Sequence, residues 1–177
     1  TDSGLAILNS LPNLKHLVVG GGQLSGAGLV HLAAPCNIEF LSLYGPAVTD
    51  ESVQVVSRLT RLKRLNLYRT TITDQALQTV AKCATLEQIW LTEVNVTDAG
   101  LQELSKLTGL KKLDCRRTGV TADGVAKLTT SNPQVDVWTQ DAFREEGHMM
   151  FQLKLMLAWV VSSVAIFTIS CKYKLAP

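Results

Sequence analysis

The sequence has few residues of the kinds that build metal or cofactor sites. Its four cysteines lie far apart along the chain: Cys36, Cys83, Cys115 and Cys171. Neither CxxC nor CxxCH occurs, so a zinc ribbon, a thioredoxin-type site and a c-type haem site have no support. Its three histidines are scattered and form no ligand pair: His16, His31 and His148. We therefore expect no metal site and no cofactor.

The sequence also lacks a strong charge of either sign. Its formal net charge is +2 over 177 residues, so no strong field favours binding to nucleic acid. The chain starts without methionine, at the start of an expected helix with no strand before it, and we expect that further residues precede Thr1.

A repeat of 24 residues organises most of the chain. A hydroxyl-bearing residue recurs at this interval in six places: Thr1, Ser25, Thr49, Thr73, Thr97 and Thr121. A first apolar column has the same spacing: Leu14, Ile38, Leu62, Leu86 and Leu110. Repeats of about 20–29 residues with an LxxLxL pattern are typical of leucine-rich repeats, which stack as a solenoid. We therefore predict an α/β horseshoe of about five to six repeats over residues 1–138.

Each further column of the repeat has an expected structural role. Two more strand columns are almost wholly apolar: Leu17, Leu41, Leu65, Ile89 and Leu113, then Val19, Leu43, Leu67, Leu91 and Cys115. Stacking of these columns would build a continuous core that no single repeat could bury. Cys115 is thus expected in the core, and Cys83 falls at a helix end among leucines, so a disulfide between them is not expected.

The hydroxyl column precedes each expected helix. A Thr or Ser side chain there can accept a hydrogen bond from a free N–H of the first turn. Aspartates that follow it favour the positive end of the helix. A metal-binding role for the Thr-Asp pairs is the alternative. The column three residues after the hydroxyl holds only small residues, which we interpret as a requirement of close packing between neighbouring helices. Its members are Gly4, Gly28, Ser52, Ala76, Gly100 and Gly124.

The repeats resemble a known class. The segments LKRLNLYRTTITDQAL, LEQIWLTEVNVTDAGL and LKKLDCRRTGVTADGV are similar to the "VTDAGL" leucine-rich repeats of planctomycete-type bacteria, and to cysteine-containing repeats of eukaryotic F-box proteins. No F-box helix is visible. The asparagine found in many such families is replaced by other residues: Gly22, Pro46, Thr70, Val94 and Thr118. The pattern fails near Trp138, after a break at Asn132-Pro133, where Val135 and Val137 alternate as in a closing edge strand.

The strand residues between the core columns are expected to face the concave side of the horseshoe. They bring aromatic and basic side chains onto one face, which is typical of protein–protein interfaces. A solvated face with scattered aromatics is the alternative. No Ser-His-Asp or Cys-His arrangement can be assembled, so we expect no enzyme activity. The candidate partner-binding residues are Phe40, Tyr44, Arg64, Tyr68, Arg69, Trp90, Lys112 and Arg116.

The composition changes after the repeats. Residues 139–148 form a polar linker, and Met149 to Cys171 form an apolar run long enough for one transmembrane helix. A buried helix that packs on the solenoid is the alternative. The tail, 172–177, holds Lys172 and Lys174, which favours a cytoplasmic tail and repeats on a periplasmic or otherwise non-cytoplasmic side.

Together these features predict a single-pass membrane protein that binds other proteins through its repeats. The short tail favours an accessory or scaffolding subunit whose partners are integral membrane subunits. One alternative is a receptor-like ligand-binding domain. Another is the C-terminal fragment of a larger enzyme or electron-transfer protein, since some proteins with similar repeats also carry cytochrome-like domains.

Overall fold

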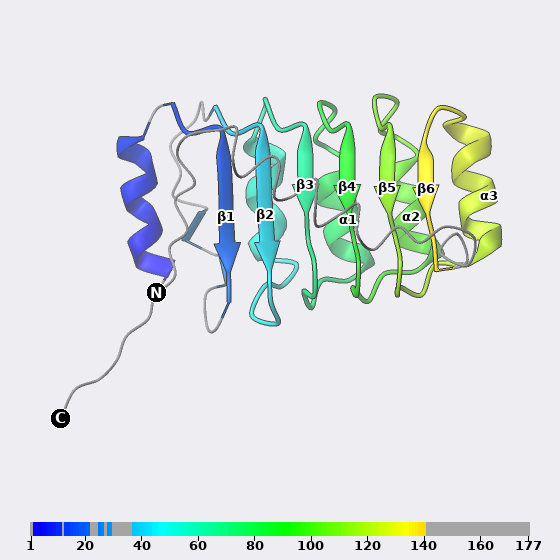
Figure 1. Cartoon of the computed structure of the whole chain (residues 1–177), viewed down its shortest axis with the longest axis horizontal. Helices are drawn as coiled ribbons and strands as arrows, with labels where there is room; N and C mark the ends of the chain where they lie inside the picture. Colours follow the sequence, from blue (N-terminus) through cyan, green and yellow to red (C-terminus); the bar gives the residue numbers. More distant parts are fainter. Residues whose placement is uncertain (1, 12, 22–24, 27, 30–36, 141–177) are drawn as a thin grey trace, which may run out of the picture.

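The computed structural model describes residues 2–11, 13–21, 25–26, 28–29 and 37–140. Within them, six strands form one parallel sheet in chain order. The strands are β1 (His16–Gly20), β2 (Phe40–Tyr44), β3 (Arg64–Asn66), β4 (Gln88–Trp90), β5 (Lys112–Asp114) and β6 (Asp136–Trp138). Figure 1 shows the strands side by side, with α1 and α2 behind the sheet and α3 at the end of the array, beyond β6.

Within the described residues, one short helical segment precedes β1 and the others lie between later strands. They are η1 (Asp2–Ser10), η3 (Ser52–Arg58), α1 (Asp74–Val80), α2 (Asp98–Leu104) and α3 (Ala122–Ser131). The repeat predicts their places, but η1 and η3 are 3-10 helices. In η3, the N–H groups of Ser52, Val53 and Gln54 bond to carbonyls three residues earlier. The three valines of this segment are β-branched and have weaker α-helix propensity than the Ala and Leu of α1.

The strand register confirms the 24-residue repeat. Leu17 pairs with Leu41, Leu41 with Leu65, and Leu65 with Ile89, each at an interval of 24 residues. The interval continues through Leu113 to Val137, so the short strand expected near Trp138 is β6. The chain is therefore an α/β repeat solenoid built from coils of the leucine-rich repeat type.

The core runs the length of the solenoid between the sheet and the helices. The predicted strand columns are buried, with Leu41, Leu65 and Ile89 fully enclosed. Helix residues such as Leu77 and Leu104 cover them from the other side. Cys83 and Cys115 are also buried, and both are free thiols. Cys36 lies outside the described residues.

The hydroxyl column caps the three α-helices as predicted. The Oγ1 atoms of Thr73 and Thr97 accept from the N–H groups of Gln75 and Ala99, each at 3.3 Å. Thr121 accepts from the N–H of Gly124, also at 3.3 Å. Thr49 differs, because its own N–H donates to Ser52 Oγ at 3.0 Å instead.

The aspartates beside these threonines bond across repeats. Asp74 Oδ1 accepts from the backbone N–H of Thr97 at 2.8 Å, and Oδ2 accepts from its hydroxyl at 2.6 Å. Asp50 bonds Thr73 in the same way, and Asp98 bonds Thr121. We name these three pairs the Asp–Thr ladder. The helix-dipole interpretation of the aspartates was thus incomplete, since each carboxylate joins one coil to the next.

The ladder also accounts for two glycines in the column of small residues. A Cβ on Gly100 would lie 2.4 Å from Asp74 Oδ1, and one on Gly124 would lie 2.1 Å from Asp98 Oδ1. The space at this position is therefore taken by the carboxylate of the preceding coil, rather than by a neighbouring helix alone. The coil before Thr49 carries Gly26 in place of the aspartate, so it offers no carboxylate to the N–H of Thr49. The hydroxyl oxygen of Ser52 accepts from that N–H instead.

The polar residues in the place of asparagine bond within their own coil. Thr70 Oγ1 donates to the carbonyl of Leu67 at 3.0 Å, and Thr118 Oγ1 donates to that of Cys115 at 2.6 Å. The predicted transmembrane helix, 149–171, lies outside the described residues. In the part of the chain that is described, no helix is long and apolar enough to cross a bilayer.

Candidate functional site

The candidate site is the strand face, which we define as the side of the sheet opposite the helices (Figure 1). Its side chains come from strand residues that alternate with the core columns. The register aligns Phe40, Arg64, Gln88 and Lys112 in one row, and Ser42, Asn66, Trp90 and Asp114 in the next. The repeat thereby brings together residues that are 24 positions apart in the sequence.

The first row forms an aromatic and basic cluster on β1, β2 and β3. The rings of His16 and Phe40 contact edge to face, with centroids 6.0 Å apart. The guanidinium carbon of Arg64 lies 5.4 Å from the Phe40 centroid, within the range of a cation–π contact. Partial burial, followed by the charge of Arg64, lowers the pKa of His16. Phe40 and Arg64 are half-buried rather than fully exposed.

Tyr44 is the most open of the predicted aromatic residues, with 37% of its surface exposed. Its ring packs on the preceding coil, where a Cβ on Gly20 would lie 2.7 Å from Tyr44 Cδ1 and 2.1 Å from its carbonyl oxygen. Glycine at this position therefore allows the close approach of the two coils. Tyr68 follows one repeat later and is half-buried, with the Arg69 guanidinium carbon 5.0 Å from its ring centroid.

Trp90 and Arg116 are less accessible than the sequence predicts. Trp90 is half-buried in the centre of the sheet. Arg116 forms a fork with Asp114, through Nε–Oδ1 at 2.8 Å and a second short contact between Nη2 and Oδ2. The Asp114 side chain is only 2% exposed and that of Arg116 18%. The bond to Asp114 raises the pKa of Arg116. Arg116 therefore neutralises a buried carboxylate, and much of its binding capacity is occupied.

Trp138 is a further aromatic residue of this face that the sequence analysis missed. It lies in β6 in register with Asp114, and the Lys112 ammonium is 6.0 Å from its ring centroid. Its Nε1 donates to Asp136 Oδ2 at 2.8 Å. The signal in the sequence is its spacing, because Trp138 stands two repeats after Trp90.

A ladder of alternating charge runs along the rim where the strands end. We define the carboxyl rim as Arg69, Glu93 and Arg117. Glu93 lies between the two arginines, with Oε2 2.6 Å from Arg69 Nε and Oε1 2.6 Å from Arg117 Nη1. The Arg69 and Arg117 side chains are 59% and 63% exposed. Hydrogen bonding to Arg69 is the main reason that the pKa of Glu93 is lowered.

The backbone of the carboxyl rim is left-handed. The φ angles of Arg69, Glu93 and Arg117 are 53°, 59° and 54°, and the preceding coil has Gly45 at this position. A left-handed residue with a side chain costs on the order of 1 kcal/mol, whereas exposed ion pairs contribute little to stability. The ion pairs therefore do not explain why the sequence keeps large charged residues where glycine or asparagine would be less strained.

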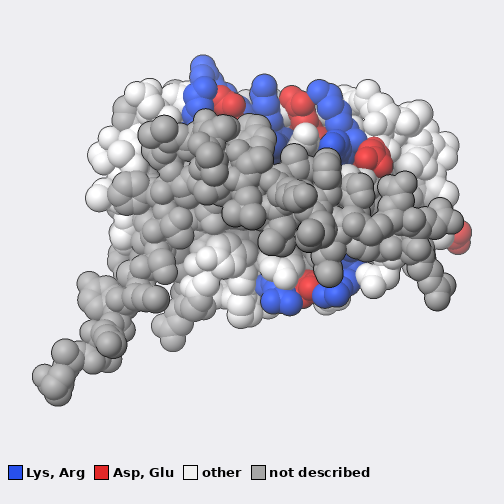
Figure 2. Space-filling model, viewed as in Figure 1, with Lys and Arg blue, Asp and Glu red and all other residues white. Residues whose placement is uncertain are grey.

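A second ladder runs along the rim where the strands begin. We define the amino rim by its column: Lys15, Glu39, Lys63, Glu87 and Lys111. Lys15 pairs with Glu39 at 3.2 Å, and Lys111 with Glu87 at 2.7 Å. These lysines are the main cause of the lowered pKa values of the two glutamates. Figure 2 shows alternating basic and acidic side chains along the two edges of the strand face. The sequence signal was the alternation of charge at 24-residue intervals, which the sequence analysis did not detect.

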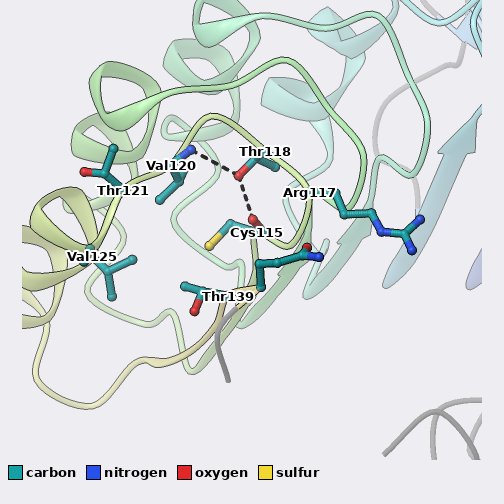
Figure 3. A pocket seen from close by; sticks show the side chains of 9 residues that line it. Cys115, Arg117, Thr118, Val120, Thr121, Val125 and Thr139 are labelled. Atoms are coloured by element: carbon teal, nitrogen blue, oxygen red, sulfur yellow. Dashed lines mark hydrogen bonds between the residues drawn. The ribbon is translucent and has the colours of Figure 1, made fainter. Parts of the chain in front are cut away.

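A hollow of about 540 Å³ lies at the end of the described array. Figure 3 shows the Cys115 side chain pointing between Val120, Val125 and Thr139. Burial, with a smaller effect of Asp114, raises the pKa of Cys115 to about 12, so the group is a neutral thiol at pH 7. No base activates it as a nucleophile among the described residues that line the hollow. Likewise, no group of three or more His, Cys, Asp or Glu within the described ranges could hold a metal ion.

Among known proteins, similarity to this chain is found in solved structures. No known family matches the sequence, and no curated protein does. The chain is similar to a solved structure of an internalin (inlF) from Listeria monocytogenes, with 16% identity and a TM-score of 0.38. The match covers 77% of this chain and 50% of the internalin chain, so the chain spans about half the length of that protein.

Proposed function

We propose that this protein is a membrane-anchored module for protein–protein interaction and that it has no catalytic activity of its own. The observation that carries the proposal is the strand face. The Phe40 ring lies there beside the Arg64 guanidinium, and the Tyr68 ring lies beside that of Arg69. Tyr44 ends the same strand as Phe40 and is exposed. Aromatic residues and arginine are enriched at the centres of protein interfaces, because aromatic rings bury much apolar surface and the guanidinium forms several hydrogen bonds and stacks on rings.

The anchor is the apolar run from Met149 to Cys171, which has the length and composition of a single membrane-spanning helix. Lys172 and Lys174 follow it, so the repeats would lie on the non-cytoplasmic side. A tether of this kind raises the effective concentration of the strand face near other membrane proteins. We therefore propose an accessory or scaffolding role in a larger membrane complex, with repeats of the VTDAGL class.

The first test is purification of the native protein in a mild detergent, followed by mass spectrometry of the proteins that travel with it. Stoichiometric co-migration with integral membrane proteins would support the accessory role. Recovery of the protein alone, or its loss into the soluble fraction, would contradict that role.

The second test asks whether the strand face makes the contact. We expect Tyr68→Ala with Trp90→Ala to abolish partner binding while the array stays folded, because both side chains lie on the proposed interface. A matched control is Gln54→Ala with Gln78→Ala, two exposed positions on the helical side. Unchanged co-purification of the aromatic variant would place the interface elsewhere on the protein.

A further inference from the structure

The carboxyl rim carries large charged side chains at positions where glycine would be less strained. Arg69, Glu93 and Arg117 adopt left-handed backbone conformations at the same position of three successive coils. Backbone strain of this kind persists where the surrounding structure enforces it, and it is concentrated at functional positions. Here the main chain is fixed by hydrogen bonds to the next coil, from Arg69 N to Thr92 O and from Glu93 N to Arg116 O, both at 3.1 Å. These bonds fix the main chain of the rim at Arg69 and Glu93, and the Glu93 carboxylate bonds the side chains of both arginines.

Glu93 orients both guanidiniums without saturating them. The structure gives one hydrogen bond from Arg69 Nε and one from Arg117 Nη1 to its carboxylate. A guanidinium has five N–H donors, so most donors of each arginine are left for another acceptor. Both side chains are more than half exposed. Adjacent strands are about 4.8 Å apart, which places the two arginines about 10 Å apart along the rim.

An aromatic surface adjoins these arginines. Tyr68 precedes Arg69 and carries the Arg69 guanidinium over its ring at 5.0 Å. Tyr44 occupies the equivalent place one coil earlier and is the more exposed of the two. The patch thus combines an excess of positive charge with open aromatic surface. Its charge complement is a carboxylate-bearing ligand, since arginine binds carboxylates through two parallel hydrogen bonds.

We propose that Arg69 and Arg117, with Tyr44 and Tyr68, form a docking edge for an acidic polypeptide segment of the protein partner. Two carboxylates of the segment bind the two guanidiniums, and an apolar or aromatic side chain next to the carboxylate on Arg69, on the side away from Arg117, packs on the tyrosines. This inference rests on the proposed function, because it specifies the chemistry of the partner that the strand face binds.

The direct test measures binding of a fluorescein-labelled nonapeptide of glutamates with one central phenylalanine. Fluorescence anisotropy is recorded with the full chain in mild detergent at low salt. We expect the glutamate peptide to bind at least ten-fold more tightly than its glutamine counterpart. Arg69→Gln with Arg117→Gln should weaken binding of the glutamate peptide about ten-fold or more, since a charged hydrogen bond is removed at each site.

The matched control is Lys82→Gln with Lys127→Gln, which removes two exposed positive charges from the helical side. Its affinity for the glutamate peptide should equal that of the unaltered protein. An equal loss in both double variants would reduce the effect to overall charge, and no loss in the arginine variant would overturn the proposal. Tighter binding of a single-stranded oligonucleotide at the same arginines would also overturn it. Circular dichroism of each variant verifies that the array remains folded.

Co-purification separates this inference from the proposed function. If Arg69→Gln with Arg117→Gln retains a partner that Tyr68→Ala with Trp90→Ala loses, the interaction module stands and the acidic docking edge is wrong. If no partner co-purifies with the unaltered protein, the accessory role fails, whatever the outcome of the peptide titration.

Discussion

Replacement of Asp74 by alanine should reveal how strongly the Asp–Thr ladder joins neighbouring coils. Asp74 accepts two hydrogen bonds from Thr97, at 2.8 Å from its N–H and 2.6 Å from its hydroxyl. Hydrogen bonds to charged groups contribute about 1.5–3 kcal/mol each when buried. Asp74 is half-buried and Thr97 is exposed, so solvent competes for both bonds. We therefore expect the free energy of unfolding to fall by about 2 kcal/mol in total.

The chain offers a matched control for this change. Asp123 also lies in the first turn of a helix, α3, but it is exposed and makes no hydrogen bond to another coil among the described residues. Its replacement by alanine should remove only a helix-dipole interaction, about 0.5 kcal/mol. The loss in free energy of unfolding for Asp74→Asn should lie between those of the two alanine variants, because the amide keeps one acceptor oxygen but loses the charge.

The assay is urea unfolding of the full chain in mild detergent, followed by tryptophan fluorescence and circular dichroism. The midpoint and the slope are both recorded, because a change in slope would indicate partial unfolding of the array instead of a change in stability. Equal losses for Asp74→Ala and Asp123→Ala would refute the reasoning. In that case the carboxylate would act on its own helix only, and stacking of the apolar columns would alone hold the coils together.

Two further predictions concern the core and the response to acid. Ile89→Asp should unfold the array, because Ile89 is fully buried and an unpaired carboxylate there costs several kcal/mol of stability. The control is Gln88→Asp on the strand face, which should remain folded by circular dichroism. A soluble, folded Ile89→Asp protein would contradict the assignment of the core column. Stability should also fall as the pH drops below about 4.5, the ordinary pKa of a glutamate, because carboxyls with lowered folded-state pKa values stabilise the fold above their unfolded pKa and lose that contribution as the pH falls through the folded one. Among the described residues, these carboxyls are Glu39, Glu87, Glu93 and Asp98. Urea midpoints measured from pH 7 down through this range test the prediction. The variant with Glu39, Glu87 and Glu93 replaced by Gln should show a smaller change of midpoint with pH. The same change as in the unaltered protein would show that the rim ion pairs do not contribute to stability.

Much of the candidate site could be predicted from spacing alone. The period of 24 residues places Phe40 beside Arg64 and Tyr68 next to the Arg69 column, and the register confirms the rows. Exposure could not be predicted in this way. Arg116 was expected on an open face, yet it bonds to Asp114, which is 2% exposed. Whether a charged side chain faces solvent or a neighbour depends on its rotamer and on the coils on both sides, neither of which a column of residue types contains.

The sequence by itself determined the coil, because apolar residues that recur every 24 positions can be buried together only if successive coils stack in register. It also determined the helix starts, since a hydroxyl before each helix can satisfy a free N–H of the first turn. Only the tertiary structure decided which neighbours the polar residues bind. Asp74 reaches Thr97, 23 positions away, and Glu93 joins Arg69 to Arg117 across two interfaces. Such bonds depend on how far one coil is displaced and rotated relative to the next, and that geometry is set by packing of the whole core.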